Sequence, residues 1–256
     1  MHTYVFDSTF EGLLTAVFEH FERKPGPVRL ISTTAYQPSL LGSELMVPTD
    51  PAKAGRVWKG LLQRFTGDWP LKYYASWLSE DQEAFDHLFQ LALYLFRNDA
   101  GACMNFGNTH VLFVEQVYHK VHREKHRMEA FIRFRQTNDG IYYALVRPDF
   151  NVLPLIGRHF KDRYADQQWV IYDEKRRYGL YYDRDKVEEI NLEFLSGESA
   201  AVPDVAVWDE REDLYSTLWK DYFKSANIPA RNNPKLHLRH VPKRYWRYLT
   251  EKDVRA

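Results

Sequence analysis

A wide apolar stripe follows the polar segment Ser79-Glu80-Asp81 and is the strongest folding signal in this sequence. Its members recur at the spacing of one helix face, and they are Phe85, Leu88, Phe89, Ala92, Leu93 and Phe96. The segment before them supplies the polar groups that begin a helix. With 256 residues, 45% of them hydrophobic, the chain is long enough to bury such a helix in one generous core or two small ones.

The segment before this helix reads as strand, helix, strand. Residues 2–6 alternate like a strand, and Asp7-Ser8-Thr9 supplies N-cap chemistry for an amphipathic helix that stops before Pro25. Residues 28–31 can return as a second strand, and residues 49–51 cap a further helix. We therefore expect a β-α-β and helical segment over residues 1–80.

Residues 81–256 are expected to form the main α+β domain, packed with the first segment as one compact unit or as two subdomains. A long helix is predicted from about Asn108, followed by a strand over residues 128–135. Asn138-Asp139-Gly140 suits a hairpin turn, because these residues tolerate positive φ, and residues 141–146 form the returning strand.

Further along, Asn151 and Pro154 open a helix that carries Ile156 and Phe160. Three strand-like runs follow, at residues 169–172, 178–182 and 187–192. Residues 196–203 resemble a surface loop that precedes a helix through Leu214 and Leu218. The order of elements predicts an α+β fold in which helices pack on a mainly antiparallel sheet, with an irregular basic tail.

Charge is balanced over the whole chain, with 35 basic and 35 acidic side chains, but it is not evenly distributed. Between residues 220 and 247 Asp221 is the single acid, whereas the bases are Lys220, Lys224, Arg231, Lys235, Arg239, Lys243, Arg244 and Arg247. Interspersed prolines and asparagines favour an irregular segment. Such a tail suits a nucleic acid, because cations neutralise phosphates and exposed aromatic rings stack on unpaired bases.

The candidate nucleic-acid-binding residues of the tail are Lys224, Arg231, Lys235, Arg239, His240, Lys243, Arg244, Tyr245 and Trp246. An alternative remains open, in which the tail packs Trp246 and Tyr248 on the core and leaves its charges in solvent. Lys175, Arg176 and Arg177, between two predicted strands, form a second candidate that offers cations to phosphates.

A densely charged region around residues 158–173 is the candidate for catalysis. His159, Asp162, Asp166 and Asp173 supply the groups needed for general acid and base chemistry. The alternative is an exposed helix face whose salt bridges contribute little. His119, His122 and His126 have helical spacing, but the basic residues between them favour a solvated surface over a metal site, and we predict no metal ligands.

Several classes of protein are excluded by absent motifs. The sequence has no phosphate-binding glycine motif, no Gly-x-Ser-x-Gly elbow and no cysteine cluster, so we expect no bound cofactor. Cys103 is the single cysteine and is expected in the core, as in a reducing compartment. Because no apolar run is long enough to span a bilayer and residues 1–10 lack a signal peptide pattern, a cytoplasmic location without membrane contact is expected.

The chain also resembles a bacterial family described as a probable DNA-metabolism protein, a domain of unknown function. The matching stretches lie at residues 4–14, 128–134, 148–155 and 163–173, and in the tail around Asn227-Ile228, Asn233-Pro234 and Arg244-Tyr245-Trp246. Members of this family are typically encoded beside a putative radical-SAM protein, and some are fused to a domain similar to uracil-DNA glycosylases. The resemblance transfers no catalytic residue.

This resemblance implies DNA repair or modification, and DNA, the radical-SAM protein and a uracil-DNA-glycosylase-like domain as partners. Our first hypothesis is a DNA-binding accessory protein that acts with such a partner. The alternatives are a DNA-acting enzyme of glycosylase or nuclease type, which uses acidic residues and His159, and a scaffold whose basic tail docks a protein.

Overall fold

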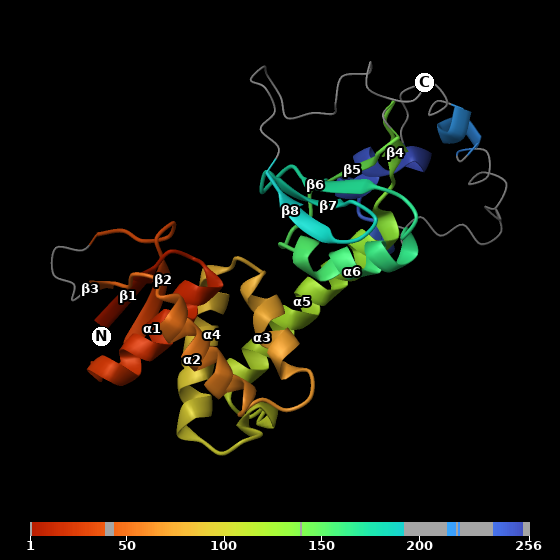
Figure 1. The fold of residues 1–256 in the computed structure, drawn as a ribbon. Helices are drawn as coiled ribbons and strands as arrows, with labels where there is room; N and C mark the ends of the chain where they lie inside the picture. The colour runs from red at the N-terminus through yellow and green to blue at the C-terminus, as the bar shows by residue number, and fades with distance from the viewer. Residues whose placement is uncertain are drawn as a thin grey trace. The chain divides into compact units, whose positions relative to one another are not determined.

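The computed structural model describes residues 2–38, 44–138, 140–191, 214–218, 220 and 238–252, which form an α+β fold (Figure 1). The chain divides into two compact units, Met1–Arg123 and Glu124–Ala256. The predicted division between residues 80 and 81 lies inside the first unit. Within the described parts of the chain, none of the helices combines the length and apolar character that a membrane crossing requires.

The first unit contains a small parallel sheet of β1 (His2–Phe6), β2 (Val28–Ser32) and β3 (Glu44–Met46). Its order is β2-β1-β3, and Val5 of the central strand pairs with Ile31 and with Met46. Helix α1 (Phe10–Arg23) connects β1 to β2 and begins at Thr9, whose hydroxyl accepts the N–H of Gly12. The predicted β-α-β segment is confirmed, whereas β3 and the all-parallel pairing were not predicted.

Three further helices contribute to the core of the first unit, namely α2 (Pro51–Leu62), α3 (Trp69–Trp77) and α4 (Gln82–Arg97). The predicted N-caps are confirmed, because Asp50 accepts the N–H of Ala52 and Asp81 accepts the N–H of Glu83. The α4 stripe is buried in the core, as its apolar spacing predicts.

Helix α4 also satisfies the open edge of strand β2. Gln82 accepts the N–H of Ser32 at 2.8 Å and donates to the Leu30 carbonyl at 2.8 Å, and Asp86 accepts the N–H of Leu30 at 2.8 Å. An edge strand presents unpaired backbone groups, and side chains from a covering helix satisfy them here. Helix and sheet are therefore joined by polar as well as apolar contacts.

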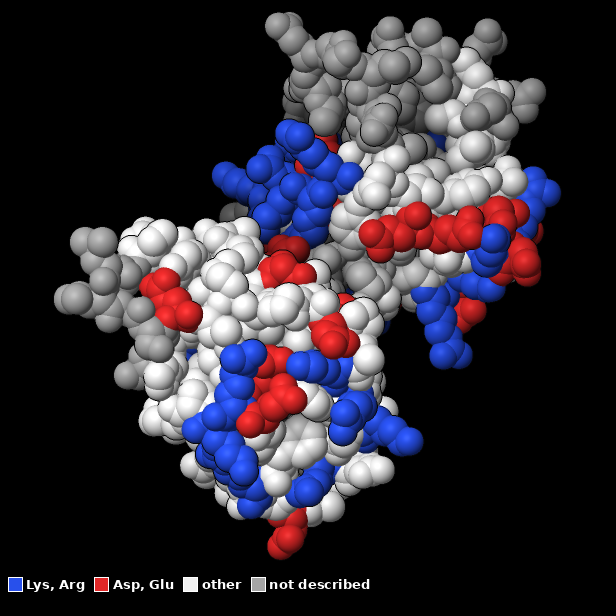
Figure 2. Space-filling model, turned by 60° about the vertical axis from the view of Figure 1, so that its left-hand side comes forward, with Lys and Arg blue, Asp and Glu red and all other residues white. Residues whose placement is uncertain are grey.

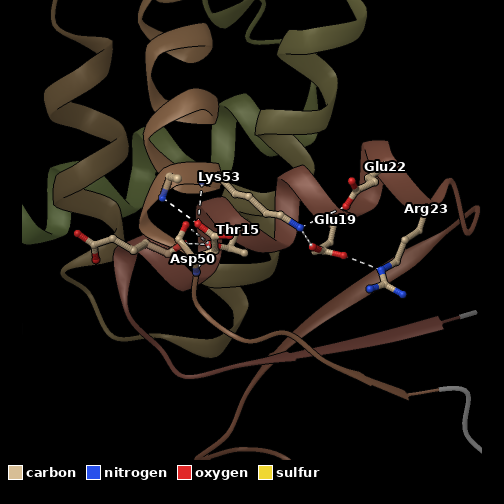
Figure 3. A network of polar contacts seen from close by, with 8 residues as sticks. Thr15, Glu19, Glu22, Arg23, Asp50 and Lys53 are labelled. Carbon is tan, nitrogen blue, oxygen red and sulfur yellow. Dashed lines mark hydrogen bonds and ion pairs between the residues drawn. The ribbon is translucent and has the colours of Figure 1, made fainter.

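Ion pairs and hydrogen bonds join α1 to the start of α2 (Figure 3). Lys53 Nζ and Arg23 Nε each lie 2.6 Å from an oxygen of Glu19, and the Thr15 hydroxyl accepts the N–H of Asp50 at 3.1 Å. Figure 2 shows basic and acidic side chains interleaved on the first unit. Because its cations have acidic neighbours, this face does not offer a continuous positive surface to a polyanion.

A partly buried histidine pair makes the stability of the first unit sensitive to pH. The Nδ1 atoms of His87 and His110 lie 3.1 Å apart, and the His87 ring stacks on Phe113. Burial lowers the pKa of both imidazoles below the usual value, and His87 lowers that of His110 further. A histidine with a lowered folded pKa binds more protons when unfolded, so its contribution to stability is complete above about pH 6.5 and is lost as pH falls.

We therefore expect the free energy of unfolding of the first unit to fall between pH 7.5 and pH 5. Hydrogen exchange of the α4 amides in urea measures this unit separately. The His110→Gln variant, which has one titrating group fewer, should show a smaller decrease over the same range. An equal decrease in the variant would contradict the assignment to this pair.

The second unit contains a five-stranded sheet of β4 (Arg135–Gln136), β5 (Tyr142–Val146), β6 (Trp169–Asp173), β7 (Tyr178–Tyr182) and β8 (Val187–Ile190), in sequence order. The pairs β4–β5, β6–β7 and β7–β8 are antiparallel, whereas β5 and β6 are parallel and are connected through α6 (Leu153–Arg163). Gly140 has a φ of 84° in the predicted hairpin turn, and Asp139 lies outside the described residues.

The predicted strand over residues 128–135 is wrong. Helix α5 (Thr109–Phe131) continues through the first half of it, and only Arg135 belongs to a strand. Met128 and Ile132 are spaced four apart and are both buried, at 2% and 7% exposure, so this segment follows the helical period. Extending an existing helix also avoids the cost of nucleating a new element.

The remaining predictions fall partly outside the described residues. Residues 214–218 are helical, as predicted, whereas the predicted loop at residues 196–203 is not among the described residues. Cys103 is fully buried in the first unit, as expected.

Candidate functional site

The parallel pair β5–β6 places two polar segments at the same edge of the sheet. Val146 and Asp173 are paired at the carboxyl ends of these strands, and the N–H of Glu174 donates to the Val146 carbonyl at 3.0 Å. Residues 147–151 follow β5, and residues 174–177 follow β6. Because parallel strands end at the same edge, the two segments are neighbours, in the position where sheets of this kind bind ligands.

Asp173 supports the turn after β6. Its side chain is fully buried, accepts the N–H of Lys175 at 2.8 Å, and lies 2.8 Å from the Arg176 guanidinium. Burial raises the pKa of the Asp173 carboxyl, although Arg176 opposes this shift. Arg177, at the end of the turn, has a φ of 59°. Because the carboxylate is enclosed by its own turn, it serves to position cations and has no access to a substrate.

Asp149 links this turn to the tail. Its backbone carbonyl accepts Lys175 Nζ at 3.0 Å and Arg176 Nη2 at 3.2 Å, while its carboxylate lies 2.5 Å from Arg244 Nη2. Its N–H donates to Glu124 Oε1 at 2.8 Å. One residue after β5 therefore contacts α5, the β6–β7 turn and the tail.

Tyr245 anchors the tail in the second unit. It lies in the 3-10 helix η4 (Lys243–Tyr248), is 1% exposed, and donates its hydroxyl hydrogen to Glu124, which is itself 1% exposed. Burial raises the pKa of Tyr245, so the phenol stays protonated and keeps donating. Arg127 and Arg244 lie 3.4 and 3.6 Å from the same carboxylate. Glu124 is thus a buried acceptor for several donors at once.

A second set of contacts holds the rest of η4. Arg247 and the Tyr248 hydroxyl both donate to Glu174, and Arg133 pairs with Glu251 at 3.0 Å. Trp246 is partly exposed, and its indole N–H donates to the Val241 carbonyl at 3.0 Å. In this structure η4 packs against other parts of the second unit, and the Tyr245 ring is not accessible for stacking on a base.

Most cations of this site are more exposed than the carboxylates of Glu124, Asp173 and Glu174. Glu124 and Asp173 are buried and the Glu174 side chain is 12% exposed, whereas Asp149 is 48% exposed. The exposed cations are Arg147, Lys175, Arg177, Lys243, Arg244 and Arg247. In the upper part of Figure 2, where the second unit is seen, Lys and Arg side chains form a group on one side and lie among acidic side chains on the other. The outward charge of the site is therefore positive.

The four candidate catalytic residues do not form one centre. His159 Nδ1 lies 3.8 Å from Glu129, and Asp162 lies 3.7 Å from Arg158 on the exposed side of α6. Asp166 is exposed in the segment between α6 and β6. Asp162 and Asp166 precede β6, whereas Asp173 ends it, so they lie at opposite ends of this strand. The five residues from Trp169 to Asp173 span about 13 Å.

The candidate nucleic-acid-binding residues are only partly described. Lys224, Arg231 and Lys235 lie outside the described residues, and Arg239 and His240 are exposed in a helical turn. The structure does bring the Lys175–Arg177 turn together with Arg244, through Asp149. Among the described residues, no three His, Cys, Asp or Glu side chains are placed to hold a metal ion.

Glu124, Arg147, Asp149 and Glu174 belong to the site but were not predicted from the sequence. The available signal was the helix between the strands at residues 142–146 and 169–173, because such a connection joins parallel strands. Polar residues directly after both strands would then have been recognised as neighbours at one edge.

No curated protein matches this sequence. A family model described as a domain of unknown function, DUF4130, matches residues 82–251, which include α4, α5 and nearly all described residues of the second unit. Because this match covers more than half of the chain, the protein belongs to the DUF4130 family of domains of unknown function.

Proposed function

We propose that the second unit binds DNA through the phosphate backbone, with Arg147, Lys175 and Arg177 as the central contacts. The observation that carries this proposal lies at the carboxyl ends of β5 and β6, where the buried Asp173 carboxylate fixes the turn that carries the exposed Lys175 and Arg177, and Arg147 is exposed directly after β5. Lys and Arg bind phosphates and release counterions, which favours association with a polyanion.

Ion pairs limit which cations of the tail can bind phosphates. Arg244 and Arg247 lie in ion pairs with Asp149 and Glu174, and a phosphate would have to compete with these carboxylates. Within the described residues, Arg147, Lys175 and Arg177 have no carboxylate within ion-pair distance. These three side chains are therefore better placed than the described tail residues to bind phosphates.

The variant carrying Arg147→Gln, Lys175→Gln and Arg177→Gln tests this assignment. Each lost phosphate contact lowers the slope of log affinity against log salt by about one, so we expect the triple variant to lose about two to three units of slope. Fluorescence anisotropy with labelled duplex and single-stranded DNA, titrated with KCl, measures both affinity and slope.

A matched variant carries the same charge change at the other end of β6. Arg158, Arg163 and Arg184 are exposed on α6 and on the β7–β8 turn, and their replacement by Gln should leave the slope nearly unchanged. If both triple variants had the same slope, the salt dependence would follow net charge alone, and the proposed interface would be wrong.

We propose further that the chain acts in DNA repair or modification beside a radical-SAM protein or a uracil-DNA-glycosylase-like partner. This part of the proposal is supported by the family resemblance described above. Binding is favoured over catalysis at this site because Asp173 is enclosed and Asp162 and Asp166 lie at the opposite end of the strand. Co-purification with the partner after nuclease treatment distinguishes a direct protein contact from one bridged by DNA.

A further inference from the structure

A pocket of about 440 Å³ opens at the carboxyl ends of the three parallel strands of the first unit. It is lined by the ends of β1 and β3 and by residues that follow all three strands, and these are Val5, Phe6, Asp7, Thr33, Met46, Val47, Pro48 and Thr49. Its volume lies in the range of small-molecule sites.

The strand order places this pocket at a reversal of the chain path. From the central strand β1 the chain continues to β2 on one side, and it later returns to β3 on the other side. The pocket lies at the end of this central strand, between residues that follow β2 and β3. Open parallel sheets bind their ligands in the crevice at such a point.

Asp7 supplies a fixed negative charge in the lining. Its Oδ1 accepts the N–H and hydroxyl of Thr9, and its Oδ2 accepts the hydroxyl of Thr49 at 2.8 Å. Partial burial raises the pKa of Asp7, but the hydrogen bonds from Thr9 and Thr49 outweigh it, so that the pKa is lowered overall. A side chain at Gly12 would collide with this carboxylate, so glycine is required there.

The same arrangement argues against an anionic ligand. The first turn of a helix after a strand commonly binds phosphate, because its free N–H groups and the helix dipole favour negative charge. Here the Thr9 hydroxyl accepts the Gly12 N–H, and the Asp7 carboxylate occupies the adjacent position. The remaining lining is mainly apolar, with Met46 exposed at 56%.

We propose that this pocket binds a small molecule that combines an apolar body with a hydroxyl or ammonium group, which donates to Asp7. The apolar body lies against Met46, Val47 and Pro48. The site is contained in the first unit, so this proposal does not depend on DNA binding by the second unit.

Three small molecules test the proposal on the full chain: one is uncharged, one is cationic and one is anionic. Adenosine offers hydroxyl groups, tryptamine offers an ammonium group, and adenosine monophosphate adds a negative charge to the first probe. In amide NMR spectra, we expect adenosine or tryptamine to shift the signals of Val5, Asp7, Thr33 and Thr49. The monophosphate should bind more weakly than adenosine because of the Asp7 charge.

The Asp7→Asn variant keeps one acceptor oxygen but removes the charge, and it should weaken tryptamine binding about tenfold, the value of a charge-assisted hydrogen bond. Glu11→Gln removes a charge from the exposed first turn of α1 outside the pocket lining and should leave binding unchanged. Met46→Lys, at an exposed position, supplies a competing ammonium group and should also weaken tryptamine binding.

The proposal is overturned if neither probe shifts these signals at millimolar concentration, or if the shifted signals lie elsewhere in the chain. Equal effects of Asp7→Asn and Glu11→Gln would overturn it as well, as would a monophosphate that binds as tightly as adenosine. A shift with adenosine alone or tryptamine alone supports the site and identifies the donor group. Anisotropy with labelled DNA, measured on the same Asp7→Asn sample, should be unchanged.

Discussion

The Glu124→Ala substitution is expected to lower the free energy of unfolding of the second unit by about 3–5 kcal/mol. The carboxylate is 1% exposed and accepts from the Asp149 N–H and the Tyr245 hydroxyl, with Arg127 and Arg244 beside it. Removing the carboxylate leaves the Asp149 N–H and the Tyr245 hydroxyl without this acceptor, and Arg127 and Arg244 lose a negative neighbour. A buried donor that has lost its acceptor lowers the stability of the folded state.

Urea unfolding followed by hydrogen exchange of the β6 and β7 amides measures this loss in the second unit alone. Limited proteolysis should at the same time show faster cleavage within η4, because Tyr245 loses its acceptor. The matched control is Glu188→Ala, whose carboxylate is 50% exposed and pairs with Lys186, and it should change stability little. If both variants lose the same free energy of unfolding, burial does not make the Glu124 carboxylate more important for stability than the exposed Glu188 carboxylate.

The Asp173→Ala substitution should cost a similar amount, about 3–5 kcal/mol, and should also weaken DNA binding. The Arg176 side chain, 8% exposed, loses the Asp173 carboxylate and keeps the carbonyls of Pro148 and Asp149 as acceptors. The turn that carries Lys175 and Arg177 then loses the hydrogen bonds that fix it. DNA affinity therefore falls although none of the three proposed phosphate contacts has been replaced.

Asp183 provides a control with the same local geometry. It accepts the N–H groups of Asp185 and Lys186, each at 2.8 Å, in the β7–β8 turn. That turn is more exposed, so Asp183→Ala should destabilise the unit less and leave DNA affinity unchanged. If Asp173→Ala lowers the free energy of unfolding as predicted but keeps full DNA affinity, the turn is not part of the DNA-binding interface.

Much of the fold could be predicted because its signals are local. The caps at Thr9, Asp50 and Asp81 act on neighbouring backbone groups, and the apolar stripe of α4 follows the helical period. The strands β6 and β7 begin and end nearly where alternation and turn residues predict. Helix α3 was missed because aromatic residues occupy several of its faces and no single stripe stands out.

The site was harder to predict because its residues meet only through the sheet pairing. Sequence spacing gave no reason to connect Glu124 with Tyr245, which are 121 residues apart. The basic tail was recognised by its composition, but composition does not tell whether a cation faces solvent or a carboxylate. Arg244 illustrates this, since Asp149 and Glu124 lie beside it. We also expected a mainly antiparallel sheet, and therefore did not predict that the parallel strands β5 and β6 end at the same edge.

The contact between Tyr245 and Glu124 has a consequence for synthesis of the protein. The first unit comprises residues 1–123, so it can fold while the ribosome is still translating the second. The second unit buries Glu124 only after residue 245 has been made and a loop of 121 residues has closed. Its last folding step is therefore a late, long-range event, and until then a charged carboxylate and the ends of β5 and β6 stay uncovered in the nascent chain.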